Sequence, residues 1–183
     1  TNYETADFEM VEGKDYADST YVCDLASIPV EDGRFDAVIC SQVLEHVPVP
    51  DAVMAELHRV IRPGGELWIS APLFYEEHAK PVDYYRYTEF AWRRFAGLVG
   101  FEVISIEPLE GYDATLSHQL KPAAVHLPSR LMPPTLFSGL LARWFAARAF
   151  RHPSAGDGLC KNYRCSLRTA AWESTRVDRG LNA

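Results

Sequence analysis

The stretch from Phe35 to Leu73 constrains the fold more than any other part of this chain. Its first segment, FDAVIC at 35–40, is a continuous apolar run, which is typical of a parallel strand buried on both faces. Its last segment, ELWISAPL at 66–73, has strand character again. A polar loop and a helical pattern lie between the two apolar segments.

The helical pattern has a start, an apolar face and a stop. Asp51 is a suitable N-cap, and Pro63-Gly64-Gly65 is expected to end the helix. The face is formed by Val53, Leu57, Val60 and Ile61. Strand, helix and strand make one βαβ unit, and such units build parallel sheets whose ligands sit at the carboxyl ends of the strands.

Two runs in this unit resemble a known family. FDAVICSQVLEHV, followed by ELHRVIRPGGELWIS, is similar to the part of class I S-adenosylmethionine-dependent methyltransferases (type 11-like) that follows their glycine loop. The resemblance implies an α/β fold with a Rossmann-like, mostly parallel sheet and flanking helices. It also implies S-adenosylmethionine as the cofactor.

The first strand of that family and its glycine-rich turn, similar to D-x-G-x-G-x-G, have no counterpart here. The nearest glycines, at Gly13, Gly33, Gly64 and Gly65, do not form the pattern. The chain opens with YETADFEM, which resembles the family's second strand with its acidic end. We therefore expect either a fragment of a longer chain or a degenerate relative, and an opening Thr1 favours the fragment.

Length and composition limit the classes of protein that fit. The 183 residues predict one methyltransferase-like domain over 1–172, with a helical insertion or lid at 111–157 and a frayed tail at 173–183. An apolar share of 48% excludes a disordered chain, and a net charge of −7 argues against nucleic acid as a partner.

The four cysteines, Cys23, Cys40, Cys160 and Cys165, show no C-x-x-C spacing and no paired histidines. We expect buried free thiols, which fit a reducing cytoplasm, and no bound metal.

The remaining elements follow from local patterns. Strands are expected in YETADF, TYVCDL, FEVISIEPL and NYRCSLRT, the last with Tyr163, Cys165 and Leu167 on one face. A helix should begin after Thr88 and end at Gly100, with one side formed by Phe90, Phe95, Leu98 and Val99.

The resemblance assigns the cofactor-binding residues. Asp7 would accept the ribose hydroxyls, and Asp24 would accept the adenine amino group, with Leu25 and Ala26 beside the ring. Ser41 and Gln42, at the end of FDAVIC, would meet the methionine part. The alternatives are a helix cap or a solvated strand end at Asp7, and an Asx turn at Asp24.

The segment 74–95, FYEEHAKPVDYYRYTEFAWRRF, is the best candidate for the acceptor site, because long ordered loops at the ligand edge of an α/β sheet tend to be functional. Its pattern resembles a methyltransferase subgroup of sugar and cell-surface polysaccharide pathways. His78 or Asp83 would act as base, and the acceptor would be held by Tyr84, Tyr85 and Arg86. Alternatively, Asp83 and Arg86 pair internally and the tyrosines plug the sheet edge.

His46, in LEHV, is the third candidate base, and a purely structural role for it stays open. The apolar helix at 135–150 also has two interpretations. Its leucines, aromatic residues and arginines suit a peripheral membrane or dimer contact, while a thin polar face favours a lid or core helix.

The resemblance implies methyl transfer from S-adenosylmethionine to a small-molecule or saccharide-type acceptor. Two alternatives remain: a non-catalytic methyltransferase-like binding or scaffold module, and a nucleotide-sugar oxidoreductase on a similar sheet.

Overall fold

The computed structural model describes residues 2–8, 15, 17–126, 132–151 and 160–171. The tail expected at 173–183 lies outside these residues. The four free cysteines form no disulfide, and Cys40, Cys160 and Cys165 are buried as expected, with Cys23 half-buried.

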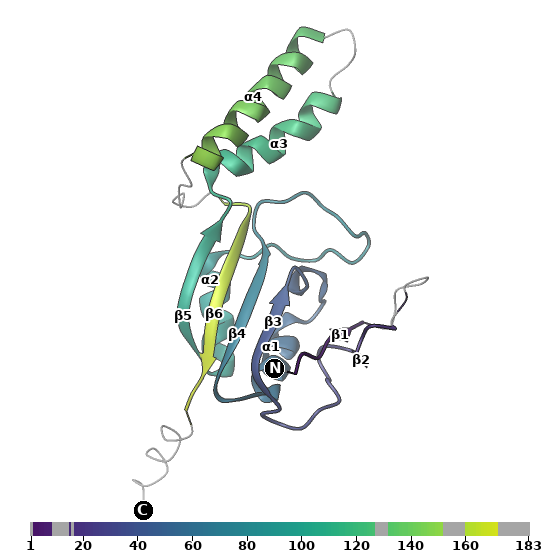
Figure 1. Ribbon diagram of the computed structural model, residues 1–183, viewed down its shortest axis with the longest axis vertical. Helices are drawn as coiled ribbons and strands as arrows, with labels where there is room; N and C mark the ends of the chain where they lie inside the picture. The colour runs from purple at the N-terminus through teal and green to yellow at the C-terminus, as the bar shows by residue number, and fades with distance from the viewer. Residues whose placement is uncertain (1, 9–14, 16, 127–131, 152–159, 172–183) are drawn as a thin grey trace, which may run out of the picture.

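A four-stranded sheet forms the centre of the molecule (Figure 1). Its strands stand in the order β3 (Phe35–Ser41), β4 (Ile61–Pro72), β6 (Asn162–Thr169) and β5 (Phe101–Leu109). β3 and β4 are parallel, and β6 is antiparallel to both β4 and β5. β3, β4 and β5 therefore run in one direction, which confirms the predicted mostly parallel α/β sheet.

A second, two-stranded parallel sheet lies beside β3. It consists of β1 (Ala6–Asp7) and β2 (Tyr21–Val22), both shorter than the expected strands. The amide of Cys23 donates to the carbonyl of Asp7 at 2.8 Å, so the carboxyl ends of the two strands lie together. β3 is an edge strand of the larger sheet among the described residues.

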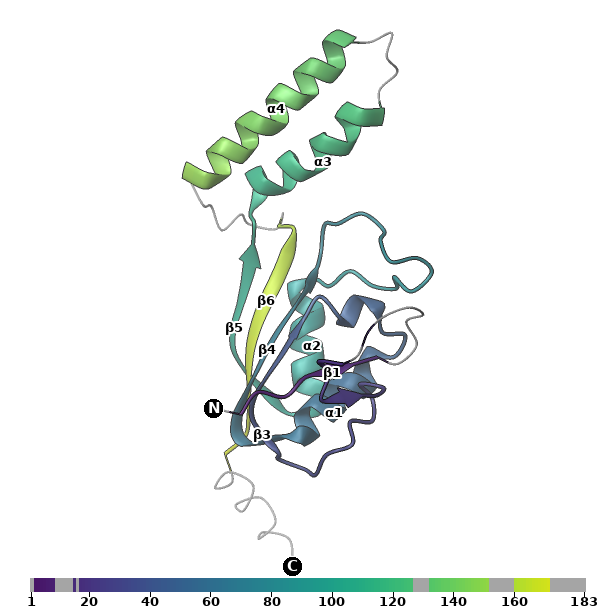
Figure 2. The ribbon, with the colours of Figure 1, turned by 45° about the vertical axis from the view of Figure 1, so that its right-hand side comes forward.

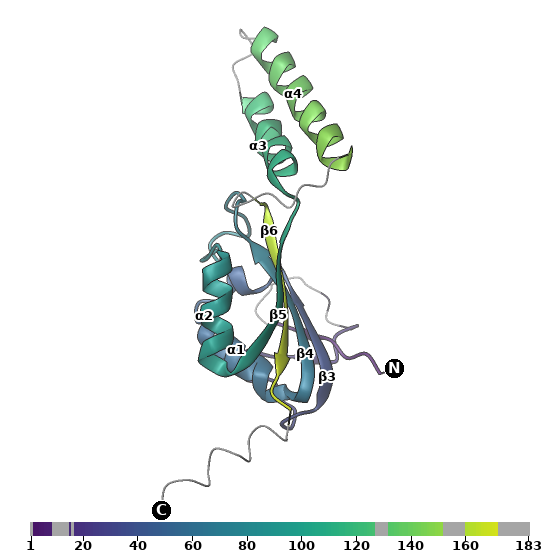
Figure 3. The ribbon, with the colours of Figure 1, turned by 90° about the vertical axis from the view of Figure 1, so that its left-hand side faces the viewer.

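The helices α1 (Pro50–Val60) and α2 (Glu89–Val99) lie on the same side of the four-stranded sheet (Figure 3). Their buried side chains meet those of the central strands in one core, which includes Leu57, Leu67, Trp92, Cys165 and Leu167. Because helices cover one side only, the prediction that 35–40 is buried on both faces is wrong. The side chain of Ile39 is 75% exposed.

The apolar face of α2 also differs from the expectation. Trp92, Phe95 and Ala96 are buried, whereas Phe90 and Leu98 are 78% and 57% exposed. The sequence carries apolar residues on more than one side of this helix, and the sheet decides which side is buried. The expected N-cap at Thr88 and the left-handed C-terminal Gly100 are confirmed.

Both ends of α1 differ from the predicted ones. The helix begins at Pro50 without a side-chain cap, and Asp51 lies in its first turn. Proline suits that position because its fixed φ matches the helix and its missing N–H has no intrahelical partner there. The helix ends at Val60, so Ile61 and Pro63-Gly64-Gly65 belong to β4 instead of the helix and its stop.

The helices α3 (Tyr112–His126) and α4 (Met132–Arg151) form a hairpin that projects beyond the end of the sheet (Figure 2). Both helices lie within the segment 111–157, and α4 packs mainly against α3, not on the sheet. The interpretation of α4 as a core helix is corrected accordingly. In the described part of the chain, no helix is both long and apolar enough to cross a membrane.

Candidate functional site

Polar side chains meet where β3 and β4 end. Parallel pairing places Ser41 opposite Ser70, and their hydroxyl oxygens are 2.8 Å apart. The amide of Gln42 donates to the carbonyl of Ser70 at 2.9 Å. Gln42 adopts a φ of +56°, a left-handed conformation that costs free energy for a side chain of this kind and often marks a functional position.

A cleft of about 500 Å³ opens at this edge of the sheet. It is lined by residues from four strand ends and from the loop after β4: Ser41, Gln42, Ser70, Tyr75, His78, Leu109, Glu110, Lys161 and Asn162. The predicted residues Ser41, Gln42 and His78 therefore share one cavity. The sequence patterns did not identify Glu110, Lys161 or Asn162, because they come from distant segments that only the sheet order brings together.

The 3-10 helix η1 (Leu44–His46) follows β3 and carries a buried acid. The side chain of Glu45 is fully buried, and neither carboxylate oxygen has a hydrogen-bond partner. Burial raises the pKa of this carboxyl above its ordinary value, because the charged form loses its hydration. Glu45 was not predicted as a site residue, since nothing in LEHV tells which of its residues turns inward.

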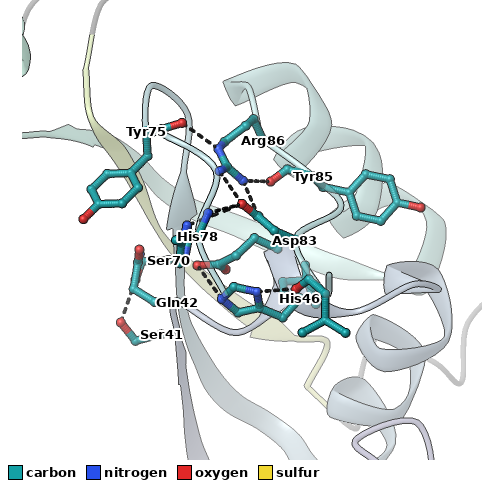
Figure 4. A network of polar contacts seen from close by, with 12 residues as sticks. Ser41, Gln42, His46, Ser70, Tyr75, His78, Asp83, Tyr85 and Arg86 are labelled. Carbon is teal, nitrogen blue, oxygen red and sulfur yellow. Dashed lines mark hydrogen bonds and ion pairs between the residues drawn. The ribbon is translucent and has the colours of Figure 1, made fainter. Parts of the chain in front are cut away.

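His46 and His78 lie beside this acid, and Figure 4 shows the two imidazoles near each other. The Nε2 atom of His46 is 3.9 Å from Oε1 of Glu45, and the two imidazole rings meet edge to face with centroids 4.8 Å apart. The Nδ1 atom of His46 lies 2.6 Å from the carbonyl oxygen of Val82 and must donate its proton there, because a carbonyl only accepts.

Asp83 and Arg86 form an ion pair with each other, which is the alternative to acceptor binding in the sequence analysis. Both guanidinium Nη atoms donate to the carboxylate, at 2.7 and 2.8 Å. The carboxylate also accepts the amide of His78 at 2.8 Å. Arg86 holds the pKa of Asp83 well below its ordinary value. Because Arg86 further donates to the carbonyls of Tyr75 and Glu76, this pair holds the loop together.

The tyrosines of the loop divide into two kinds. The hydroxyl of the buried Tyr87 donates to the carbonyl of Leu44 at 2.8 Å. The amides of Tyr84 and Tyr85 donate to the carbonyl of Glu45, which fastens the loop to η1. The rings of Tyr84 and Tyr85 are 47% and 40% exposed, so aromatic faces remain accessible beside the cluster.

The residues predicted for the nucleoside lie at the ends of β1 and β2, outside the lining of the cleft. Asp7 accepts the amide of Phe8 at 2.9 Å. Asp24 accepts the amide of Ala26 at 2.8 Å, the Asx turn foreseen as the alternative. A carboxylate has further lone pairs, so this turn leaves acceptor capacity. Leu25 is half-buried next to it.

Residues 5–69, which include β1 to β4 and η1, match a family model described as a methyltransferase domain. Over this segment the chain is similar to methyltransferase domains. The chain is 43% identical over 56 residues to the ubiquinone biosynthesis O-methyltransferase of Azotobacter vinelandii, an alignment that covers 31% of this chain. It spans only 23% of that relative's length.

Two solved structures share the methyltransferase fold. One is the Bacillus halodurans C-125 protein BH2331, described as a methyltransferase, with a TM-score of 0.54 and 16% identity over 92% of this chain and 84% of that one. The other is the 1,6-didemethyltoxoflavin-N1-methyltransferase of Burkholderia thailandensis, with a TM-score of 0.50 and 14% identity over 90% of this chain and 60% of that one. At these identities the likeness shows the fold alone.

Proposed function

We propose that the protein transfers the methyl group of S-adenosylmethionine to a small-molecule acceptor of saccharide type. The observation that carries this proposal is the position of the acidic and polar strand ends. Asp7, Asp24 and Ser41 all fall within the matched methyltransferase segment, each at or just after the carboxyl end of its strand. This is the edge at which open α/β sheets bind their ligands.

The cofactor is proposed to lie along these strand ends. Asp7 would accept the ribose hydroxyls and Asp24 the adenine amino group, while Leu25 and Ala26 flank the ring. Ser41 and Gln42 would meet the methionine part, beside the cleft. The Burkholderia thailandensis enzyme was solved with bound S-adenosylhomocysteine, the product that methyl transfer leaves, which supports this choice of cofactor.

The reaction would be one in-line displacement. The acceptor oxygen loses its proton, forms a bond to the methyl carbon and expels the sulfur as S-adenosylhomocysteine. Orientation and exclusion of water supply most of the rate enhancement in such a step. Of the three predicted bases, His46 and His78 are the proposed proton-handling groups. Asp83, engaged by Arg86, would position His78.

The acceptor is proposed to bind over the cleft and the rings of Tyr84 and Tyr85. Aromatic faces pack well on sugar rings, and both rings are accessible. The names of the relatives refer to acceptors as different as a ubiquinone precursor and didemethyltoxoflavin. The acceptor specificity of this protein therefore has to come from its own loop 74–87.

Asp24 provides the test of this proposal. In the natural protein, D24A and D24N should raise the dissociation constant for S-adenosylmethionine about tenfold or more, because adenine loses its acceptor. Turnover at saturating cofactor should change little, because the adenine contact is the same in ground and transition states. D24N keeps an oxygen for the Asx turn and so separates cofactor binding from folding.

The matched control is D18A, which removes an exposed carboxylate from the same region. Calorimetry measures the dissociation constant for the cofactor. Turnover is measured by the transfer of a labelled methyl group to sugar-nucleotide and lipid-linked acceptors. Unchanged affinity with a large loss of turnover contradicts the role of Asp24. Cofactor binding without transfer to any acceptor favours the scaffold module, and hydride transfer from a nicotinamide favours the oxidoreductase.

A second proposal concerns α4, which we place on an anionic membrane surface in the cytoplasm. Leu136, Leu140 and Trp144 recur every four residues and are exposed, as is Phe150. The helix contains three arginines and no acidic residue. An exposed apolar stripe with basic side chains is typical of a helix that lies in a lipid interface.

A further inference from the structure

We propose that Glu45, His46 and His78 form a binding site for a divalent transition metal ion of the zinc class. Each side chain offers one ligand atom, and these atoms lie within 4.8 Å of one another. Two imidazoles and one carboxylate are a common ligand set of catalytic zinc sites, which keep further positions open.

The buried carboxylate is the first argument for a cation. Glu45 is fully buried, and both of its oxygens lack a hydrogen-bond partner. A buried polar group without a partner costs free energy, so such groups are rare in native proteins unless a ligand or ion satisfies them. Arg86, whose charge also acts on Glu45, is already paired with Asp83 through both Nη atoms.

The hydrogen bonds of the two histidines are the second argument. Nδ1 of His46 donates to the carbonyl of Val82, and Nδ1 of His78 lies 3.2 Å from the carbonyl of Glu76. Each carbonyl selects the tautomer with the proton on Nδ1, which leaves the lone pair on Nε2. Metal-bound histidines are held in this way by backbone carbonyls or carboxylates behind them.

The geometry needs only a small adjustment to bind an ion. Ligand atoms around a tetrahedral ion lie roughly 3.3 Å apart, because metal–ligand bonds are about 2.0–2.1 Å. Nε2 of His46 is 3.9 Å from Oε1 of Glu45, and all three ligand atoms lie within 4.8 Å of one another, so each pair has to approach by about 1.5 Å or less to bind an ion. The backbone beneath is held in place, since the carbonyl of Glu45 accepts the amides of Tyr84 and Tyr85.

The position of the cluster indicates what the ion would do. His78 also lines the cleft, together with Ser41 and Ser70, so the open positions of the ion would face the bound acceptor. With the ion bound, the Nε2 atoms of His46 and His78 would be its ligands and could no longer take the acceptor's proton. The ion would replace them in that role, because a metal ion that binds a hydroxyl oxygen lowers the pKa of the hydroxyl and lets the proton leave to water. This role rests on the proposed methyl transfer; the binding of the ion does not.

Metal binding is measured without cofactor or acceptor, on the tag-free chain. Titration with Zn²⁺ by calorimetry and with Co²⁺ by visible absorption should give one ion per chain and a tetrahedral Co²⁺ spectrum. E45Q, H46A and H78A should each lose about a hundredfold or more in Zn²⁺ affinity. H58Q, which alters a histidine outside the cluster, should bind like the original protein.

The melting temperature separates a metal site from a merely structural cluster. Zn²⁺ should raise it in the original protein but not in the three variants. Metal-free E45Q should melt no lower than the metal-free original, because glutamine carries no charge to bury. If E45Q does not fold, H78A carries the test, since His78 is a partly exposed loop residue.

The proposal is overturned if the original protein does not bind Zn²⁺ stoichiometrically. It is also overturned if E45Q and H78A bind Zn²⁺ as tightly as the original protein does. Stoichiometric binding in a protein that transfers no methyl group leaves the metal site standing and overturns the proposed function instead. Methyl transfer that survives complete chelation keeps the proposed function and overturns the ion's role at the acceptor.

Discussion

Gly65 lies in β4 where this strand passes close to the backbone of β3. A Cβ atom at this position would stand 2.6 Å from Cγ2 of Ile61 and 2.7 Å from the carbonyl oxygen of Asp36. The second of these neighbours is backbone and cannot rotate away. Local sequence marks this residue only as part of a turn, whereas the structure makes it a packing requirement.

We therefore expect G65A to lower the free energy of unfolding by about 1–3 kcal/mol, as overpacking does in other cores. The control is G97A, because Gly97 lies in α2 with no atom within 4 Å of the added methyl group. G97A should be neutral or stabilising by up to about 1 kcal/mol, since alanine favours helix. Urea unfolding compares the two, and equal stabilities would contradict the close approach.

Cys40 shows how burial excludes one chemistry at this edge of the sheet. The thiol lies in β3 one residue before Ser41, and burial raises its pKa to about 12. A thiol in this state is not ionised near neutral pH and is a poor nucleophile. The acceptor's own oxygen is therefore the better candidate for attack on the methyl group.

At the scale of elements, loop 74–87 and η1 form one unit. The loop is tied to η1 through the carbonyls of Leu44 and Glu45, and internally through Asp83 and Arg86. This arrangement supports the structural alternative for the ion pair, while a role in acceptor binding stays a prediction. If the pair holds the loop, its loss should lower stability, whereas if Arg86 binds the acceptor, its loss should change the acceptor kinetics.

If the pair holds the loop, D83A and R86A should each lower the free energy of unfolding by about 2–3 kcal/mol. D83A leaves the partly buried guanidinium of Arg86 without its partner, and R86A does the same to the buried carboxylate of Asp83. The double variant should then lose little more than either single variant. If Arg86 instead binds the acceptor, R86A should raise the acceptor KM and leave the melting temperature nearly unchanged. Melting curves and acceptor kinetics on the same four proteins separate these outcomes.

At the scale of the whole molecule, the α3–α4 hairpin stands apart from the sheet and yet reaches the cleft. The ring of Tyr75 in the cleft stacks on His118 of α3, with centroids 4.8 Å apart. Binding of α4 to a surface would therefore place the cleft close to that surface. This arrangement suits an acceptor that is itself held at a membrane.

We expect the protein to sediment with phosphatidylglycerol vesicles and not with phosphatidylcholine vesicles, with the difference lost at high salt. A variant carrying L140E and W144E should stay in the supernatant, because two charges then replace the centre of the apolar stripe. V22E, which alters an exposed apolar residue of β2, is the control. A concentration-dependent dimer that the double variant abolishes, without vesicle binding, would show that a second copy covers α4.

The sequence by itself determined the order of the strands, the helices α1, α2 and α4, and the βαβ unit, but not α3 or η1. Apolar runs such as ELWISAPL and the alternation in 162–169 are local properties, and so are the cap at Thr88 and the glycine at Gly100. The family resemblance also rests on such runs. These features depend on backbone preferences and burial within one segment, so no tertiary contact is needed to recognise them.

Only the tertiary structure decided which apolar faces are covered and which polar groups meet. Ile39 is exposed because the helices among the described residues cover the other side of the sheet, and Phe90 is exposed because the sheet buries a different side of α2. α4 packs on α3, a contact that neither segment alone reveals. Glu45 and His78 are 33 residues apart in the chain and come together because the loop folds back onto η1. Contacts between distant segments are set by how the elements pack, which is why the candidate metal site cannot be read from residue spacing.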